Sequence, residues 1–309
     1  MRPKICCVAV VLTLLAVAPP CAAAPRGKAE PAQIIDLLTK DGVTLKITYY
    51  QSPGGKDSAV VVLLPDLKDS RGLMTSMATR LQSPGPADAH KPMAAVTVDL
   101  RGHGDSVSRV LASGRTGEIS ASRLRKSDYV AMVLEDMEAV RRFLVEKNDS
   151  GELNLNRLAI VGAGLGASVA TNWAARDWSA PPLAVGKQGQ DVKTLVLVSP
   201  RWNFNGLTMQ DALRQRGVAS DVAFMILYGN EDRKAASDAQ RVYDQLARSR
   251  PAVSPDSKEP SDLMKVDTAE TRLQGTQFMK QGGAQVEDLV IRFISKHTVE
   301  PNYPWTDRP

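Results

Sequence analysis

Cysteine and histidine are scarce in this sequence of 309 residues, which contains three of each. The cysteines, Cys6, Cys7 and Cys21, all lie near the amino terminus. A disulfide framework in the body of the chain is therefore excluded, and so are C-x-x-C zinc motifs. There is no H-E-x-x-H pattern and no two histidines are close in sequence, so we expect no metal and no other cofactor.

A strong charge of one sign is also lacking. The chain has 39 basic and 34 acidic residues and a formal net charge of +5, with no long block of either sign. Because nucleic-acid binding needs basic residues clustered on one face, we do not expect a nucleic-acid partner. Beyond the first two dozen residues no apolar run approaches the length of a transmembrane helix, so we expect no membrane span there.

The first 23 residues are predicted to be a signal peptide. A short basic start precedes the apolar run 5–18, which is too short to span a bilayer but has the length of a secretory h-region. Cleavage after Ala23 would leave no cysteine in the mature chain. We therefore expect export to the periplasm or the medium. Lipidation of Cys21 is the alternative, which Pro19 and Pro20 just before it disfavour.

The rest of the chain alternates short β-rich runs with helical patterns. This order favours an α/β fold, an αβα sandwich with a mostly parallel sheet, opened by an antiparallel hairpin at 34–50. The clearest helix is predicted to begin at Ser127-Asp128. We expect one domain over 24–298 without a large cap, and an extended tail over 299–309. The runs predicted to be buried strands are 59–64, 94–100, 158–161, 194–198 and 223–228.

Two segments carry the strongest functional signals. A D-x-R-G-H-G-x-S pattern at 99–106 ends one buried run, and a G-x-G-x-G turn at 162–166 follows another. With the order of strands around them, these segments resemble the α/β-hydrolase family over nearly the whole mature chain. The resemblance implies an αβα sandwich with a hydrolase-like function. The residues expected to be structural in these segments are Asp99, Arg101, Gly102, His103, Gly104, Ser106, Gly162 and Gly166.

The resemblance also assigns three catalytic positions, and the chain departs from the family at two of them. In the family the turn is a G-x-S-x-G elbow that exposes a nucleophilic serine; here that position holds Gly164. Asp232, after the run 223–228, fits the triad acid. The base position falls on Phe278 or its neighbour Gln277, where there is no histidine.

An oxyanion-type pair of backbone amides is expected at Leu67 and Leu165, although the first turn reads Pro65-Asp66-Leu67 where the family usually begins with His-Gly. We expect a cleft between Leu67 and Asp232, made more apolar by Phe278. Acyl transfer needs a nucleophile and a base, so the sequence predicts an inactive hydrolase-like protein that binds a small-molecule or protein ligand. The alternative is a hydrolase of the esterase class with an unrecognised nucleophile.

The glycine-rich turn also allows a dinucleotide interpretation. Gly162-x-Gly164-x-x-Ala167 after a strand matches part of a pyrophosphate-binding fingerprint. That interpretation requires an acidic residue at the end of the following strand, which instead ends in Ser199-Pro200. We therefore expect no nucleotide cofactor. Nothing in the sequence singles out a carboxylate pair acting on sugars.

Overall fold

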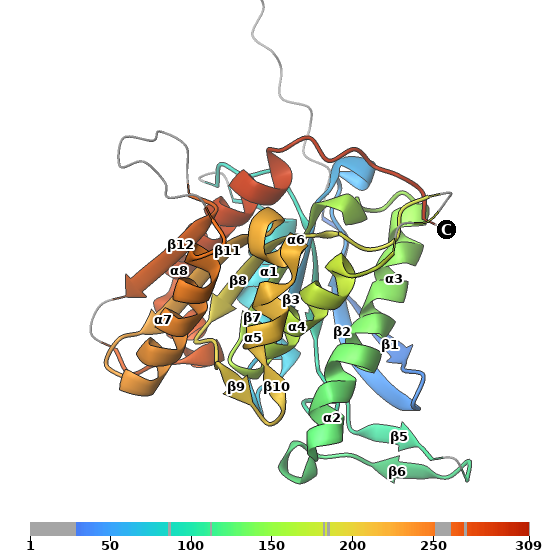
Figure 1. The fold of residues 1–309 in the computed structure, drawn as a ribbon. Coiled ribbons are helices and arrows are strands. Elements are labelled where there is room, and N and C mark those ends of the chain that lie inside the picture. Colours follow the sequence, from blue (N-terminus) through green and yellow to red (C-terminus); the bar gives the residue numbers. More distant parts are fainter. Residues whose placement is uncertain are drawn as a thin grey trace, which may run out of the picture.

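One sheet of ten strands forms the centre of the molecule (Figure 1). The computed structural model describes residues 29–85, 88–111, 113–181, 183, 186–250, 261–268 and 271–308. The strand order is β12-β11-β8-β7-β3-β4-β2-β5-β6, with β1 paired to β2. Pairing is parallel from β12 to β4 and antiparallel beyond. The strands are β1 Gln33–Leu38, β2 Val43–Tyr50, β3 Val60–Leu64, β4 Ala94–Val98, β5 Ser108–Val110, β6 Thr116–Glu118, β7 Leu158–Ala163, β8 Val192–Val198, β11 Ala223–Gly229 and β12 Leu263–Thr268.

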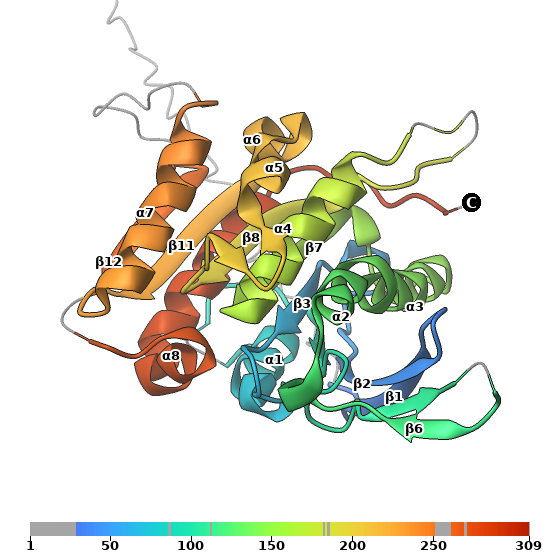
Figure 2. The ribbon, with the colours of Figure 1, turned by 60° about the horizontal axis from the view of Figure 1, so that its bottom comes forward.

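Helices cover both faces of this sheet (Figure 2). Helices α1 and α8 pack on one face, and α2, α3, α4, α5 and α7 pack on the other. A hydrophobic core therefore lies on each side of the sheet, as buried parallel strands require. The helices are α1 Thr75–Gln82, α2 Lys126–Ala131, α3 Met137–Asp149, α4 Leu165–Trp178, α5 Met209–Arg214, α6 Arg216–Asp221, α7 Arg233–Ala247 and α8 Gly275–Ile294.

The predicted architecture is confirmed. All five apolar runs form strands, and β7 lies centrally between β3 and β8. Every residue of β3, β4, β7 and β11 is buried, which explains why these strands lack polar alternation. The predicted hairpin is β1 and β2. Between β8 and β11 lie only two short strands, β9 Asn203–Phe204 and β10 Leu207–Thr208, and helices α5 and α6, so there is no large cap.

Two local predictions differ from the structure. Helix α2 begins at Lys126, one residue early, because the Asp128 carboxylate caps the helix from inside by accepting a hydrogen bond of 2.8 Å from the amide of Arg125. Strand β12 at the sheet edge was not predicted. Its sequence, LMKVDT, mixes apolar and polar residues, a weaker signal than the continuous apolar runs of the central strands.

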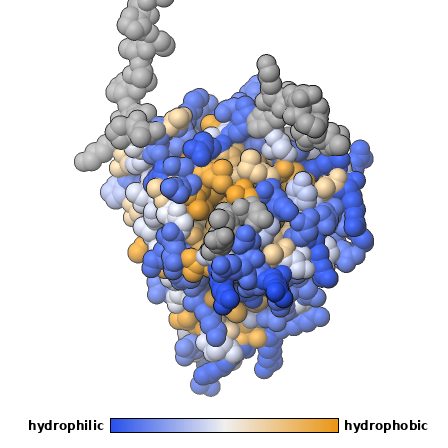
Figure 3. Space-filling view, turned by 90° about the vertical axis from the view of Figure 1, so that its left-hand side faces the viewer, coloured by the Kyte–Doolittle hydropathy of each residue, from blue (hydrophilic) through white to orange (hydrophobic). Residues whose placement is uncertain are grey.

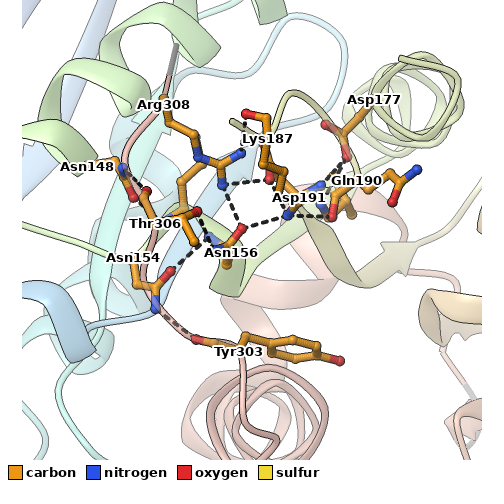
Figure 4. Close-up of polar contacts among 12 residues, drawn as sticks. Asn148, Asn154, Asn156, Asp177, Lys187, Gln190, Asp191, Tyr303, Thr306 and Arg308 are labelled. Atoms are coloured by element: carbon orange, nitrogen blue, oxygen red, sulfur yellow. Dashed lines mark hydrogen bonds and ion pairs between the residues drawn. The ribbon is translucent and has the colours of Figure 1, made fainter. Parts of the chain in front are cut away.

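The carboxyl-terminal residues cross the amino ends of β7 and β8 (Figure 4). A helical turn, Ser295–Val299, extends into the segment predicted as tail, and the extended part follows it. Three asparagine side chains donate hydrogen bonds to backbone carbonyls of this extended part. They run from Asn148 to Thr306 at 3.0 Å, from Asn154 to Tyr303 at 3.0 Å and from Asn156 to Pro304 at 2.6 Å. The tail is therefore fixed to the body of the domain.

The end of the tail completes a buried charged cluster (Figure 4). Arg308 Nη2 and Lys187 Nζ lie 2.8 and 2.9 Å from Oδ1 of Asp191. Beside it, Oδ2 of Asp177 accepts hydrogen bonds from the amides of Asp191 and Val192 at 2.7 and 3.0 Å. Burial, followed by the negative charge of Asp191, raises the pKa of Asp177 to about 7.

The predicted signal peptide lies outside the described residues. Residues 1–23 with Cys21, and the expected start of the mature chain at Ala24, belong to 1–28. Among the residues that are described, no helix combines the length and hydrophobicity that a bilayer crossing needs.

We predict that Asp177 makes the domain less stable as the pH rises from about 4 to about 7. In the unfolded chain this carboxyl loses its proton near its ordinary pKa of 3.8, whereas in the folded protein it does so near 7. Between these values the folded state holds the extra proton, so raising the pH favours unfolding. The maximum slope for one such group is about 1 kcal/mol per pH unit.

Urea unfolding of the wild type and of Asp177→Asn across this range measures the effect. The asparagine keeps an acceptor for the two amides, so the free energy of unfolding of the wild type relative to the variant is expected to fall as the pH rises. Burial lowers the pKa of Lys193 to about 8, so its titration lies above the range. Parallel pH profiles for the two proteins would show that Asp177 does not hold the proton.

Candidate functional site

A sharp turn joins β7 to α4 at the centre of the sheet. Gly164 at its tip has φ 49° and ψ −105°, the left-handed backbone that the elbow resemblance predicts. A β-carbon on Gly162 would overlap the backbone of Gly166, and one on Gly166 would overlap the backbone of Leu64. The turn therefore has the tight shape that the resemblance to a nucleophile elbow predicts, with Gly164 at its tip.

Two backbone amides beside this turn converge on one oxygen atom. The amides of Leu67 and Leu165 donate hydrogen bonds of 2.7 and 2.8 Å to Oδ1 of Asp66. They are the two amides that the sequence assigns to an oxyanion-type pair. Leu165 is also the first residue of α4, where the helix dipole favours a negative charge. In acyl transfer such a pair stabilises the oxyanion of the substrate; here it binds a carboxylate of the protein itself.

The same carboxylate fills the space beside two glycines. A β-carbon on Gly164 would overlap the Asp66 carboxylate, and so would one on Gly275, the first residue of α8. Both glycines have left-handed φ angles, 49° and 57°. The amide of Asp66 donates a hydrogen bond of 2.8 Å to Oγ1 of Thr276, which ties the aspartate to the start of α8. No side chain fits at position 164 or 275 while Asp66 adopts this conformation.

The residues expected at the base position do not reach the site. Phe278 lies on the inner face of α8, 4% exposed, and packs in the core against the sheet, while Gln277 is exposed. The expectation that Phe278 makes the cleft more apolar is therefore wrong. The physical reason is the register of α8: the helix begins at Gly275, so Phe278 lies one turn inside it and its face points to the core.

Asp232, expected as the triad acid, caps a helix at the edge of the site. Its Oδ1 accepts hydrogen bonds of 3.0 and 3.1 Å from the amides of Lys234 and Ala235 at the start of α7. These two hydrogen bonds engage one oxygen of the Asp232 carboxylate and fix the side chain at the start of α7. Asp232 nevertheless lines the cleft together with Asp66.

A cleft of about 240 Å³ lies at the carboxyl ends of the parallel strands, where the sequence predicts it. It carries charges of both signs, because Asp66, Asp232, Arg201 and Lys234 all line it. The Arg201 guanidinium lies 3.6 Å from Oδ2 of Asp66. The lining residues are Asp66, Ser199, Pro200, Arg201, Asp232, Lys234, Ala235, Asp238 and Gln274.

The D-x-R-G-H-G-x-S segment braces the fold and does not line the cleft. Arg101 is fully buried between Asp136 and Asp41, with nitrogen–oxygen distances of 2.6 and 2.7 Å. Asp99, also buried, accepts hydrogen bonds from amides of the surrounding loops. His103 Nδ1 lies 2.9 Å from the carbonyl oxygen of Arg101, and because a carbonyl can only accept, Nδ1 carries the proton. These contacts hold the loop after β4 against β2 and α3.

Asp66 is the residue of the candidate site that the sequence alone does not identify. The available signal is its place directly after the first buried strand, beside the expected amide of Leu67 and in a turn that departs from the His-Gly of the family. A side-chain acceptor in that place can reach the amide pair. Its partners at Gly164 and Gly275 are distant in sequence, so local patterns do not reveal the contact.

The site does not suit a nucleotide. A pyrophosphate would bind the first amides of α4, and the amide of Leu165 is already bound to Asp66. Within the described residues there is also no group of three or more histidine, cysteine, aspartate or glutamate side chains that could hold a metal ion.

Comparison with solved structures identifies the fold. The chain is similar to an esterase from Pyrococcus furiosus, with 13% identity and a TM-score of 0.57 over 87% of this chain and 91% of that one. It is similar to a dienelactone hydrolase from Anabaena variabilis ATCC 29413, with 14% identity and a TM-score of 0.54 over 88% and 100%. An alpha-beta serine hydrolase homologue from Coxiella burnetii has 16% identity and a TM-score of 0.51 over 84% and 96%. No family model and no curated protein matches. The chain therefore has the α/β-hydrolase fold, and at these identities the likeness extends to the fold alone.

We predict that a side chain at position 164 is tolerated only when Asp66 is removed. Gly164→Ala adds a β-carbon that overlaps the Asp66 carboxylate, so we expect the free energy of unfolding to fall by about 3 kcal/mol from overpacking and backbone strain. In an Asp66→Gly background only the strain remains. The coupling energy between the two substitutions, measured by urea unfolding, is therefore expected to be about 2 kcal/mol.

Gly114→Ala is the matched control for this cycle. Gly114 has a φ of 76°, and an added β-carbon there meets nothing within 4 Å. Gly114→Ala is expected to lower the free energy of unfolding by about 1 kcal/mol through backbone strain, by the same amount with and without Asp66. Additive effects of Gly164→Ala and Asp66→Gly would mean that the carboxylate does not occupy the space beside Gly164.

Proposed function

We propose that this protein is a non-catalytic α/β-hydrolase-fold protein that binds a small polar ligand in the cleft beside Asp66. The observation that carries the proposal is the pair of hydrogen bonds from the amides of Leu67 and Leu165 to Oδ1 of Asp66. A carboxylate of the protein occupies the place in which a hydrolase of this fold would stabilise the transition state.

Acyl transfer needs a nucleophile, a base and free oxyanion donors, and we infer that this site has none of the three. The nucleophile position is Gly164, and the start of α8 that faces it is Gly275, which offers no base. Both oxyanion-type amides are already engaged, so a substrate carbonyl cannot bind them without displacing Asp66. Removing one oxyanion donor from a working enzyme costs about 10²–10³-fold in rate. A substrate oxyanion forming beside the Asp66 carboxylate would also meet charge repulsion.

The lining of the cleft supports a small polar ligand. Its volume of about 240 Å³ is below the range of about 300–1,000 Å³ that is typical for sites of drug-sized molecules. Acidic and basic side chains both reach it, and Lys234 has no ion pair among the described residues. A ligand with donor and acceptor groups would satisfy these charges, whereas an apolar one would leave them desolvated.

A second candidate function rests on the second oxygen of Asp66. Oδ2 accepts neither of the two amide bonds, and Asp66 lines the cleft, so this oxygen could attack a substrate carbon as the nucleophile of an atypical esterase-class hydrolase. Two features disfavour it. The Arg201 guanidinium 3.6 Å away stabilises the carboxylate, and the described lining offers no histidine to activate the water that must release the intermediate.

We predict that the wild type and Gly164→Ser both fail to react with an alkyl fluorophosphonate. Serine at 164 would lack a base and would compete with Asp66 for space, so we also expect the p-nitrophenyl butyrate hydrolysis of both proteins to match the buffer background. Intact-mass spectrometry after the phosphonate incubation measures the adduct. A stoichiometric adduct on the wild type, or turnover typical of an esterase, would contradict the non-catalytic proposal.

The Asp66 nucleophile has a test of its own. Attack of Asp66 on p-nitrophenyl butyrate would release nitrophenolate and form a mixed anhydride between Asp66 and the butyryl group. In water enriched in heavy oxygen, water that opens this anhydride at the Asp66 carbon would place the label in that carboxylate, and peptide mass spectrometry would locate it. Unlabelled Asp66 after incubation with p-nitrophenyl butyrate is the outcome we expect.

We predict that a small molecule remains bound when the protein is purified in its folded state. Native mass spectrometry of the wild type is expected to show an added mass that Ala235→Trp, which fills the cleft, lacks. Ala247→Trp is the matched control, since Ala247 is exposed at the far end of the same helix. No added mass, or the same mass on Ala235→Trp, would contradict binding in the cleft.

We propose further that the protein acts outside the cytoplasm, on the support of the basic start and the apolar run 5–18. The mass of the protein secreted by its own cells tests this proposal, with a chain beginning at Ala24 expected. A chain beginning at Met1 would contradict it, and a lipid-modified Cys21 at the amino terminus would favour the lipoprotein alternative.

A further inference from the structure

A second cavity lies at the amino ends of the strands, whereas the cleft lies at their carboxyl ends. Its volume is about 640 Å³, and its walls come from the carboxyl-terminal half of α8 and from Met225 and Met264, which stand near the amino ends of β11 and β12. On the side of the molecule formed by α7, α8 and β12, Figure 3 shows hydrophobic side chains surrounded by hydrophilic ones. This volume is within the range of about 300–1,000 Å³ that is typical for small-molecule sites.

The wall of this cavity is mainly apolar. Met225 is fully buried at its base, and Met264 and Leu289 are partly buried. Phe293 adds an aromatic ring, whose centroid lies 4.5 Å from that of His297. Thioether and aliphatic side chains adapt to flexible apolar chains, since methionine has three rotatable bonds. The wall therefore suits a hydrocarbon chain better than a rigid polar molecule.

Unpaired polar atoms gather along the same cavity. His297 Nε2, His90 Nε2 and Ser295 Oγ are all shielded from solvent and have no hydrogen-bond partner among the described residues. Burial lowers the pKa of His297, so its ring is neutral at pH 7 and can exchange a hydrogen bond with a bound head group. Buried polar atoms usually have a partner, so these three atoms are available for hydrogen bonds to a ligand in the cavity.

Among the described residues of the rim, one basic side chain is free to pair with an anionic head group. Arg80 is engaged by Asp88, Asp288 and Glu287, and Lys296 pairs with Glu300 at 2.8 Å. The remaining basic side chain of the rim is Arg292, which is exposed and has no ion pair among the described residues. A carboxylate would pair with this guanidinium, and its apolar chain would extend along the methionines.

We propose that this cavity binds a single-chain amphiphile with an anionic head, such as a fatty acid, with the chain against Met225, Met264 and Leu289 and the head at Arg292. The site is independent of the cleft beside Asp66, because the cleft lies at the carboxyl ends of the strands and the cavity at their amino ends. The two ends of one sheet thus take ligands of different chemistry.

Isothermal titration calorimetry of the wild-type protein with octanoate, decanoate and dodecanoate tests the proposal. Each pair of added methylene groups is expected to tighten binding about tenfold as it enters the apolar wall. Dodecyltrimethylammonium, which has the same chain and a cationic head, is expected to bind at least about tenfold more weakly than dodecanoate.

Two variants locate the site. Arg292→Gln removes the head-group cation and is expected to weaken dodecanoate binding about tenfold, whereas Arg123→Gln, at an exposed arginine remote from every lining residue, leaves it unchanged. Leu289→Trp fills the partly exposed wall and is expected to weaken binding more than tenfold. Thermal melting checks that each variant is folded.

Three results would overturn the proposal. These are the absence of dodecanoate binding at about millimolar concentration, equal affinity for the anionic and cationic amphiphiles, and unchanged dodecanoate affinity in a folded Leu289→Trp variant. The last result would mean that the amphiphile binds elsewhere on the protein. None of these outcomes depends on whether the cleft beside Asp66 binds a ligand or hydrolyses one.

Discussion

The hydrogen bonds from two backbone amides to one oxygen of Asp66 are the contact on which the site depends. The amides of Leu67 and Leu165 come from separate turns, after β3 and after β7, and the carboxylate joins them. Its charge is stabilised by these donors and by the amino end of α4. With a carboxylate in this position, Gly164 and Gly275 can have no side chain. One interaction therefore accounts for both the occupied pair of amides and the two glycines.

The fold separates two chemical environments along the same sheet. At the carboxyl ends of the strands the cleft is small and lined by charges of both signs, whereas at the amino ends the cavity beside α8 is larger and lined by methionines and aliphatic side chains. The residues that make the bracing contacts of Arg101 and of the extended tail line neither the cleft nor the cavity. A sheet with covered faces can thus present pockets of different chemistry at the two ends of its strands, because pocket shape depends on the scaffold and activity on a few side chains.

Much of the fold could be predicted from the sequence because it rests on local patterns. The central strands are continuous apolar runs, and the left-handed Gly164 follows from the order of strand, glycine-rich turn and helix. The base position could not be predicted, since the sequence does not show that α8 begins at Gly275, which places Phe278 inside the helix and against the core. The role of Asp66 could not be predicted either, because its partners converge only in the tertiary structure. Strand β12 lacked a continuous apolar run.

A high-resolution crystal structure of the wild-type protein tests the central claim most directly, through the electron density around the amides of Leu67 and Leu165. The account predicts that Oδ1 of Asp66 lies within hydrogen-bond distance of both amide nitrogens, at about 2.7–3.2 Å. A water molecule or a ligand oxygen between these amides, with the Asp66 side chain turned into the cleft, would contradict it and would leave the oxyanion site open.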